Sequence, residues 1–187
     1  MEIQGNYLKA ASMFMGKNAL RRYLNGVYAE VSDTQLILTA TDGHRMVSIR
    51  LDVEPGQRTT KFIIPGSLLK DVKPKLMTYL SISDDDKLIT VKQEDWAKQS
   101  APLDGVFPAY RRVIPQKISG EAANYNPQYL LDAAKAVNML TGRSTMSLAM
   151  SHNGSDAGVV EINDSNVIMI IMPIISKTEF AYIKPSW

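Results

Sequence analysis

Residues 6–16 read Asn-Tyr-Leu-Lys-Ala-Ala-Ser-Met-Phe-Met-Gly, a short segment with an apolar side chain every three or four positions. Leu8, Ala11 and Met15 have the spacing of one face of an α-helix. The same spacing begins again at Leu69 and at Leu130, each 61 residues after the previous leucine. The later members of these two sets are Val72 and Leu76, then Ala133 and Val137. The chain therefore predicts three amphipathic helices at equal intervals.

Helix start and stop signals accompany this spacing. The start signals are Asn6, the run Pro65–Ser67, and Asn126 with Pro127 at the first helical position. Gly16 and Gly142 suit the left-handed residue that follows a helix. Pro74 should end or distort the second helix early, because proline cannot continue the helical hydrogen bonds.

Short runs with strand character follow each predicted helix and are separated by turn residues. These runs are Val27–Val31, Gln35–Ala40, Met46–Leu51, Tyr79–Ile82, Leu88–Val91, Met146–Met150, Gly158–Ile162 and Val167–Met172. Further strands are expected at Lys61–Ile64 and near Ile3 and Ala123. Each unit reads as a strand, a helix and about three strands, so the predicted class is α+β, with antiparallel sheets and helices on one face.

The equal spacing has an alternative explanation, in which three unrelated amphipathic helices fall at these intervals by chance. Agreement at three offsets, with strands after each helix, favours a repeat. One helix with a few strands is too small to fold alone, so neighbouring units should pair. Three is an odd number, and one unit is left without a partner.

The composition excludes several classes of protein. The chain has 187 residues, 45% of them hydrophobic, which is enough for a core, and a net charge of +2 that does not by itself indicate a nucleic-acid binder. Because there is no cysteine, disulfides, thiolate zinc sites and cysteine nucleophiles are excluded. His44 and His152 are the only histidines, and no P-loop or zinc-protease spacing occurs. We expect no cofactor.

Two further segments bear on location and metal binding. The longest apolar run, Val167–Met172, is far too short to span a membrane, and the first residues lack the pattern of a secretion signal. The expected location is the cytoplasm. Asp84–Asp86 offers carboxylates to a divalent cation, but the absence of calcium-loop spacing favours a solvated turn.

Several strings then point to one family. Residues 40–46, Ala-Thr-Asp-Gly-His-Arg-Met, read locally as a tight hairpin turn. The full string resembles a segment of the bacterial DNA polymerase III β subunit, the sliding clamp. Matches in the same order are Tyr23–Gly26, the string Asp-Gly-Val-Phe-Pro-Ala-Tyr-Arg-Arg-Val-Ile-Pro at 104–115, and Ile170–Ile174.

The resemblance implies the DNA-clamp fold and a domain organisation. Residues 1–117 resemble a complete middle domain, and residues 118–175 resemble the second half of the last domain. The chain then has about half the usual length, which favours an origin in a phage or another mobile element. Residues 176–187 extend beyond the family pattern, and this extension could cross the groove, add a strand to a neighbour or form a subunit contact.

The family is not enzymatic, so the resemblance implies no catalytic residue and no metal. It implies instead a peptide-binding groove for polymerases and other proteins with clamp-binding peptides. The matching positions are Leu24, Thr41, Gly43, His44, Arg45, Met46, Pro115, Ile170, Ile171, Met172, Pro173 and Ile174. The alternative is that Met46, Ile170 and Met172 are ordinary core residues.

The resemblance also implies loose, non-specific contact with the backbone of double-stranded DNA. The matching positions are Lys9, Lys17, Arg21, Arg22, Tyr23, Lys70 and Lys73. A solvated surface is the competing explanation for any single lysine. A clamp ring contains twelve units, so four copies of this chain would complete a homo-oligomeric ring. The rival function is a clamp-like interaction protein that sequesters clamp-binding partners without encircling DNA.

Overall fold

A computed structural model describes residues 1–17, 20–143 and 145–175, and the predicted extension at 176–187 lies outside them. The first unit, residues 2–52, contains β1 (Glu2–Gln4), α1 (Gly5–Ser12), η1 (Arg22–Leu24), β2 (Gly26–Val31), β3 (Gln35–Thr41) and β4 (Arg45–Asp52). The second unit, residues 60–100, contains β5 (Thr60–Pro65), α2 (Gly66–Leu69), β6 (Met77–Ile82), β7 (Ile89–Gln93) and β8 (Trp96–Ser100).

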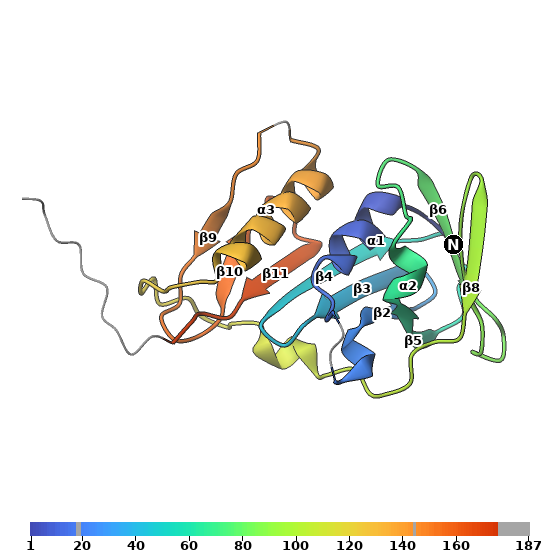
Figure 1. Cartoon of the computed structure of the whole chain (residues 1–187), viewed down its shortest axis with the longest axis horizontal. Coiled ribbons are helices and arrows are strands. Elements are labelled where there is room, and N and C mark those ends of the chain that lie inside the picture. Colours follow the sequence, from blue (N-terminus) through green and yellow to red (C-terminus); the bar gives the residue numbers. More distant parts are fainter. Residues whose placement is uncertain (18–19, 144, 176–187) are drawn as a thin grey trace, which may run out of the picture.

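A connecting segment with the short helix η2 (Tyr110–Val113) leads to the third unit, residues 118–171. This unit contains α3 (Pro127–Thr141), β9 (Ala149–Ser151), β10 (Gly158–Glu161) and β11 (Val167–Ile171). Figure 1 shows its strands beside β4, with the three α-helices gathered on one side. The predicted α+β class is confirmed.

Two antiparallel sheets are formed within the described ranges. One has the strand order β5-β2-β3-β4-β11-β10-β9, and the other has the order β1-β6-β7-β8. The first two units exchange strands: β1 of the first unit pairs with β6, and β5 of the second unit pairs with β2. The pairing of units predicted from the sequence is therefore present between the first and second units.

The third unit extends the seven-stranded sheet across its last strand. β11 pairs with β4 over five positions, from Val167 opposite Ile49 to Ile171 opposite Arg45. α3 lies against α1 and β11. The strand expected near Ala123 is not formed, because the described residues contain no fourth unit with which it could pair.

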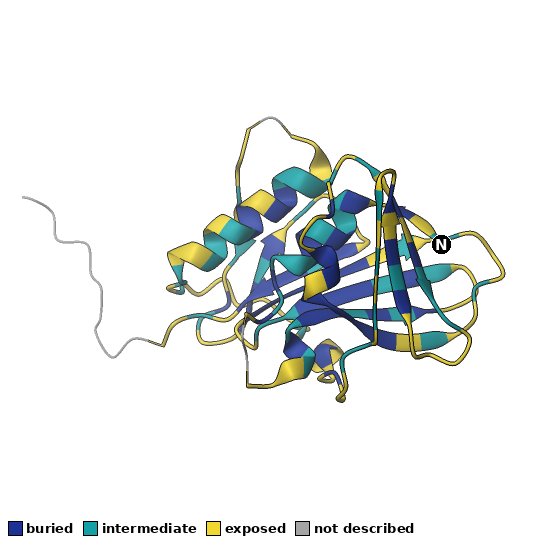
Figure 2. Cartoon of the chain, turned by 45° about the vertical axis from the view of Figure 1, so that its right-hand side comes forward, coloured by how far each residue is buried: buried dark blue, intermediate teal, exposed yellow. Residues whose placement is uncertain are grey.

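The main core lies between the helices and both sheets. Leu8, Leu38, Leu80, Ile89 and Ala136 belong to one buried cluster that draws on α1, both sheets and α3. Figure 2 shows the buried positions running through the central strands and along the inner side of the helices. Burial of this apolar surface is the main stabilising contribution to such a fold.

Local signals explain the boundaries of α3 and the short length of α2, whereas α1 begins before the predicted start signal Asn6 and ends at Ser12, well before Gly16. The side chain of Asn126 accepts a hydrogen bond from the backbone N–H of Gln128, and Gly142 ends α3 with φ of 66°. α2 is only four residues long, in line with early termination before Pro74. β8 was missed, because its segment Trp-Ala-Lys-Gln-Ser lacks the alternation of apolar and polar side chains on which the prediction relied.

Candidate peptide-binding cleft

The hairpin turn between β3 and β4 is held by its own side chains. The Thr41 hydroxyl donates to the Arg45 carbonyl (2.7 Å) and accepts from the Gly43 N–H (3.0 Å). An Asp42 carboxylate oxygen accepts from the N–H groups of His44 (2.9 Å) and Arg45 (3.1 Å). Gly43 has φ of 96°, which a residue without a Cβ adopts most easily. These bonds therefore hold the turn in one conformation, in which it forms one wall of the candidate cleft.

The end of β11 lies directly beside this turn. Ile170 is opposite Met46 in the β4–β11 pair, and Ile171 is opposite Arg45. The next residue, Met172, donates its backbone N–H to the His44 carbonyl at 2.7 Å. Segments more than 120 positions apart in the chain thus form one continuous surface.

Arg45 joins the turn to both of the packed helices. Its side chain is buried, and its guanidinium forms ion pairs with Asp42 (3.0 Å) and with Asp132 of α3 (2.7 Å). It also donates to the carbonyl of Met13 (3.0 Å), and its Cζ lies 4.7 Å from the centroid of the Tyr129 ring. A buried charge is tolerated only with such partners. Arg45 therefore links the turn of the first unit to α3 of the third.

The connecting segment forms a further wall of the cleft. Phe107 stacks on Tyr28 of β2, with centroids 4.7 Å apart, and Tyr110 meets the edge of Phe107. Gly105 has φ of 126°, and a Cβ placed on it would come within 2.9 Å of the Tyr23 ring. The Asp-Gly-Val-Phe-Pro string thus has a structural role, because it folds this segment onto the sheet.

An ion cluster holds Tyr110 in place. Its hydroxyl donates to the Glu30 carboxylate at 2.6 Å, and Arg111 and Lys61 form ion pairs with the same carboxylate. Burial alone raises the pKa of the Glu30 carboxyl, but the bonds from Tyr110 and Arg111 outweigh it and the pKa lies below its ordinary value. Burial, and secondly the Glu30 bond, raise the pKa of the Tyr110 hydroxyl.

Together these walls enclose a cleft of about 200 Å³. Its lining residues are Arg21, Leu24, Thr41, Gly43, His44, Arg45, Met46, Pro108, Ala109, Tyr110, Val113, Ile170 and Met172. Leu24, Met46 and Ile170 are buried and form an apolar floor, whereas Met172 is 38% exposed at the rim. An apolar cleft with a few polar groups suits an extended peptide with apolar anchors.

Eight of the twelve groove positions named from the sequence line this cleft, and four do not. Ile171 belongs to the helix-side core, because successive residues of a strand point to opposite faces. Pro115 lies beyond η2, outside the cleft lining. Pro173 and Ile174 also lie outside it, and the Ile174 N–H donates instead to the Asn124 carbonyl at 2.7 Å.

Five lining residues were not among the predicted groove positions. They are Arg21, Pro108, Ala109, Tyr110 and Val113. Four of them belong to the string at 104–115, which carried the family resemblance but contributed only Pro115 to the predicted groove. The sequence signal for these four is a run of apolar and aromatic residues that follows the last strand of the second unit.

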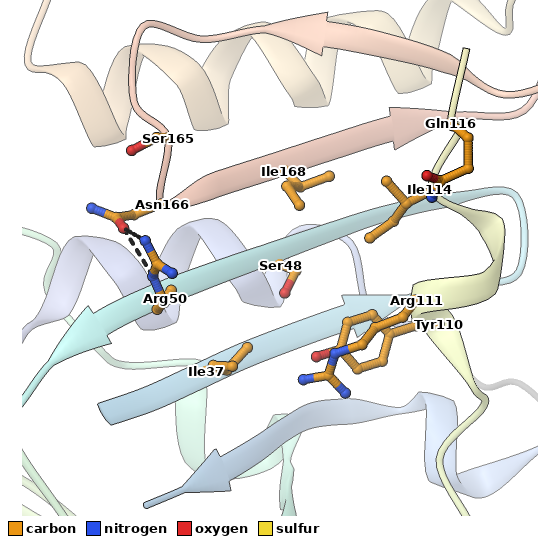
Figure 3. Close-up of a pocket in the computed structure, with 10 residues that line it drawn as sticks. All are labelled: Ile37, Ser48, Arg50, Tyr110, Arg111, Ile114, Gln116, Ser165, Asn166 and Ile168. Carbon is orange, nitrogen blue, oxygen red and sulfur yellow. Dashed lines mark hydrogen bonds between the residues drawn. The ribbon is translucent and has the colours of Figure 1, made fainter. Parts of the chain in front are cut away.

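A larger hollow of about 390 Å³ lies on the helix-free face of the same sheet. Its floor has one side chain from each of three neighbouring strands: Ile37, Ser48 and Ile168. In Figure 3, the Arg50 side chain at its rim meets Asn166, with a hydrogen bond of 2.6 Å. Arg111 is paired with Glu30. Its charged rim groups are thus already paired, and we favour the smaller cleft as the candidate site.

The predicted DNA-contacting residues divide into two groups. Lys17, Arg21 and Arg22 are exposed in the segment between α1 and β2, and Tyr23 packs against Gly105. Arg21 also lines the cleft, so one position serves both candidate surfaces.

The other three DNA candidates lie at α1 and just after α2. Lys9 donates its ammonium group to the Lys70 carbonyl at 2.7 Å, which ties α1 to the end of α2. Lys73 forms a long ion pair of 3.8 Å with Asp95. The positive charges of this group lie on the helix side of the molecule, where exposed pairs are easily screened.

The acidic run forms a turn whose carboxylates are used within the chain. Asp85 accepts from the Ser83 hydroxyl at 2.6 Å, and Asp86 pairs with Arg58 and accepts from Thr60. Among the described residues, no three acidic or histidine side chains come together as a metal site.

Comparisons with known proteins agree with this geometry. Residues 4–109, more than half of the chain, match the family model of the DNA polymerase III beta subunit, central domain. A beta sliding clamp from Vibrio cholerae is 31% identical over 123 residues, which cover 63% of this chain and 33% of that protein. A DNA polymerase sliding clamp from Bacillus subtilis aligns with a TM-score of 0.76 at 18% identity, over 94% of this chain and 64% of that one.

The fold is that of the DNA sliding clamps. The chain belongs to the DNA polymerase III beta subunit family, as the sequence predicted. This family is non-enzymatic, so the prediction that the chain is not an enzyme is confirmed. The chain spans about a third of the length of the curated relatives that it matches. No helix of the described ranges is long and apolar enough to cross a membrane.

Proposed function

We propose that the chain is a reduced sliding clamp and a processivity factor for a DNA polymerase. In this proposal it encircles duplex DNA as a homo-oligomer and binds short peptides of its partners in the cleft. The observation that supports it most is the junction of two distant segments, in which Met172 donates its N–H to His44 beside the apolar floor. An extended peptide could place one or two apolar side chains on Met46 and Ile170.

Peptide binding is tested with a defined ligand. A sliding clamp from Pseudomonas aeruginosa, which aligns with a TM-score of 0.72, 18% identity and 94% coverage of this chain (65% of that one), has been solved bound to griselimycin. We propose that griselimycin also binds this chain, in competition with a labelled peptide that carries a leucine–phenylalanine pair. Calorimetry should give one site per chain. Absence of binding by both ligands would contradict the cleft assignment.

DNA encirclement requires a topological test. A closed ring should remain on a nicked circular plasmid through gel filtration and slide off after linearisation, because its charge contacts are non-specific. Arg21→Glu with Arg22→Glu should lower retention on the circle. Lys87→Glu with Lys117→Glu makes the same charge change elsewhere and serves as the control. Equal retention on circular and linear DNA would contradict encirclement.

We also propose the domain organisation that the resemblance implies. The strand exchange between β1 and β6 and between β5 and β2 supports residues 1–117 as a complete clamp-like domain. Residues 118–175 would form half a domain, because they contribute one helix and three strands to the shared sheet. Four chains would then supply twelve units.

One observation favours a second function, that of an interaction protein that never encircles DNA. The cleft is complete within a single chain, so a monomer could bind clamp-binding peptides and sequester their owners. Under this alternative the ligands bind, but plasmid retention is the same for circular and linear DNA. The two measurements together therefore distinguish the functions.

A further inference from the structure

The first two units show how paired units are joined in this fold. The strand before each helix leaves its own unit and pairs with the first strand after the other unit's helix. The register is the same in both cases. The residue just before the helix, Gln4 or Pro65, lies opposite the first residue of the receiving strand, Met77 or Gly26.

The third unit repeats the plan of the first. α1 begins at Gly5 and α3 at Pro127, a difference of 122 positions, and Leu38 of β3 and Val160 of β10, which are buried in the same core, differ by the same 122. The residue before the helix has the same extended backbone, with φ −69° and ψ 138° at Gln4 and φ −63° and ψ 121° at Asn126. Residues 118–126 therefore have the place of a pre-helix strand, but they join no sheet among the described residues.

In the part of the chain that the structure describes, the receiving edge of the third unit is also unoccupied. β9 ends the seven-stranded sheet, whereas β2, its counterpart in the first unit, has a strand on each side. The His152 carbonyl, just past β9, accepts from the Gly120 N–H (3.1 Å), so it points away from β10. Because backbone groups alternate along a strand, those of Met150 and Leu148 point the same way. Unpaired edges of this kind recruit other strands.

Residues 118–126 are built to pair at such an edge. In the single chain they reach the end of it, through Gly120 at His152, the Gly154 N–H donating to the Glu121 carbonyl (2.9 Å) and the Ser119 N–H donating to the Asn153 side chain (2.9 Å). The Asn124 carbonyl is already taken by Ile174. Because backbone groups alternate along an extended segment, those of Tyr125 point to the side opposite the Asn124 carbonyl.

Tyr125 carries a second sign of an incomplete environment. Its hydroxyl is buried and has no hydrogen-bond partner among the described residues, and burial raises its pKa. Leu131 and Met146, on α3 and before β9, are 38% and 49% exposed. The counterpart of Tyr125 in the first unit, Ile3, is 5% exposed in the shared core.

We propose that two copies of this chain exchange residues 118–126, so that the segment of each copy forms a strand along β9 of the other. The first two units supply the register. Ile64 and Tyr125 both stand two residues before a helix, and Ile64 lies opposite Val27. Ala29 pairs with Leu38 in the first unit, and Met150 pairs with Val160 in the third. Ala29 therefore corresponds to Met150, and Val27, two residues earlier, corresponds to Leu148. Tyr125 thus lies opposite Leu148, and Asn124 opposite Ala149, of the second copy.

A second copy is the occupant that fits this edge. The exchange is self-complementary, as a two-fold interface requires, because each copy supplies one pre-helix segment and one receiving edge. It gives the third unit the partner that the first and second units have in each other. Its role in a ring rests on the proposed function, which it deepens: two third units would complete a further two-unit domain. The interface itself requires neither DNA nor a peptide.

The test uses the absence of cysteine in the chain. Variants Asn124→Cys and Ala149→Cys are mixed, unfolded together, refolded and oxidised with diamide. Directly opposed residues have the Cα separation that a disulfide needs. Asn124→Cys mixed with Thr145→Cys is the control, because its partner lies four residues, about 13 Å, along the strand. We expect about fivefold or more disulfide-linked dimer from the first mixture than from the control.

Light scattering on the unmodified chain completes the test, with an expected mass of at least twice 20.8 kDa. Equal cross-linking in the two mixtures, or a 20.8 kDa monomer at micromolar concentration, would overturn the exchange. Griselimycin binding is measured on the same samples. Binding by a monomer would overturn the exchange and support the cleft assignment. A cross-linked dimer that binds no griselimycin would support the exchange and contradict the cleft assignment.

Discussion

The first and third units share one plan and differ in their surroundings. β2 of the first unit has six residues and lies between β5 and β3, whereas β9 of the third has three and lies at an edge. Leu8 of α1 is fully buried, and its counterpart Leu130 of α3 is only partly buried against the same core. The same helical spacing therefore predicts a helix in both units. The length of the strand differs, because β2 has a neighbouring strand on each side and β9 has one on a single side.

The comparison also shows how an unpaired unit is retained. The third unit is attached to the first through the β4–β11 pair, the packing of α3 on α1 and the Arg45–Asp132 ion pair, and not through an exchange of strands. A sheet edge provides regular hydrogen bonds, and one buried guanidinium fixes the angle of α3. This attachment can be broken at single residues.

The largest effect is expected from Arg45→Met. It leaves the carboxylates of Asp42 and Asp132 without their buried partner, so we expect a loss of about 3–5 kcal/mol in the free energy of unfolding. Urea unfolding followed by circular dichroism measures it. Arg50→Met is the control: it lies on the same strand and reaches the third unit through exposed bonds to Asn166. A loss for Arg45→Met no greater than that of the control would show that strand pairing and helix packing hold the third unit without the buried ion pair.

Leu8→Ala and Leu130→Ala compare the two units at equivalent helix positions. Full burial of Leu8 predicts a loss of about 3–4 kcal/mol, because the substitution leaves a cavity. Leu130, which is partly buried, should cost about 1–2 kcal/mol in the single chain. Thermal unfolding of both variants at low concentration checks the order. Equal losses would mean that the third unit is as well covered as the first, which would sharpen the case for a covering copy.

The sequence predicted the elements whose signals are local. The full leucine spacing is helical only in α3, since α2 ends at Leu69 and α1 at Ser12, and Asn126 and Gly142 placed the ends of α3. Strands with several β-branched or aliphatic residues were also found. β8 was missed because its residues are mostly polar, and the strand near Ala123 was predicted although the described ranges hold no partner strand for it. The first error is local, because β8 pairs with the adjacent β7, whereas the second concerns pairing with a distant segment.

The candidate site shows the same limit. The turn at Thr41–Met46 and the segment ending at Met172 were placed together only through the resemblance, since nothing local links positions so far apart. Resemblance could not separate Ile170 from Ile171, which point to opposite faces of β11. It also did not show that Arg45 is a buried structural contact, because Asp132 and Tyr129 are supplied by α3.

A smaller effect is expected at the junction of the two regions, in the cleft. Met172→Asp places a charge beside the apolar floor, so the affinity for griselimycin should fall about tenfold or more. Ile174→Asp is the control, because Ile174 is exposed outside the cleft lining, two residues further on. Calorimetry measures both. If Ile174→Asp weakens griselimycin binding as much as Met172→Asp does, the ligand binds nearer to the third unit than the cleft assignment predicts.

The smallest effect is a pH dependence that belongs to the first region and not to the third. The pKa of Glu30 is lower in the folded chain than the ordinary value of 4.5, so its carboxylate stabilises the fold above that pH, and this contribution is lost as the pH falls through the folded value. Glu30→Gln should therefore cost about 1 kcal/mol at pH 7 and progressively less below pH 4.5, measured by thermal unfolding.

Glu161→Gln provides the matched change in the third unit. The Glu161 carboxylate is exposed on β10 and accepts one hydrogen bond, from Ser151 (2.6 Å), with no cation in an ion pair among the described residues. We expect its substitution to change stability little at either pH, because an exposed bond of this kind contributes little. A pH-dependent loss from Glu161→Gln equal to that from Glu30→Gln would place Glu161 in a covered environment. Glu161 is exposed among the described residues, so such a result would indicate that a further element covers this face of β10, next to the edge strand β9.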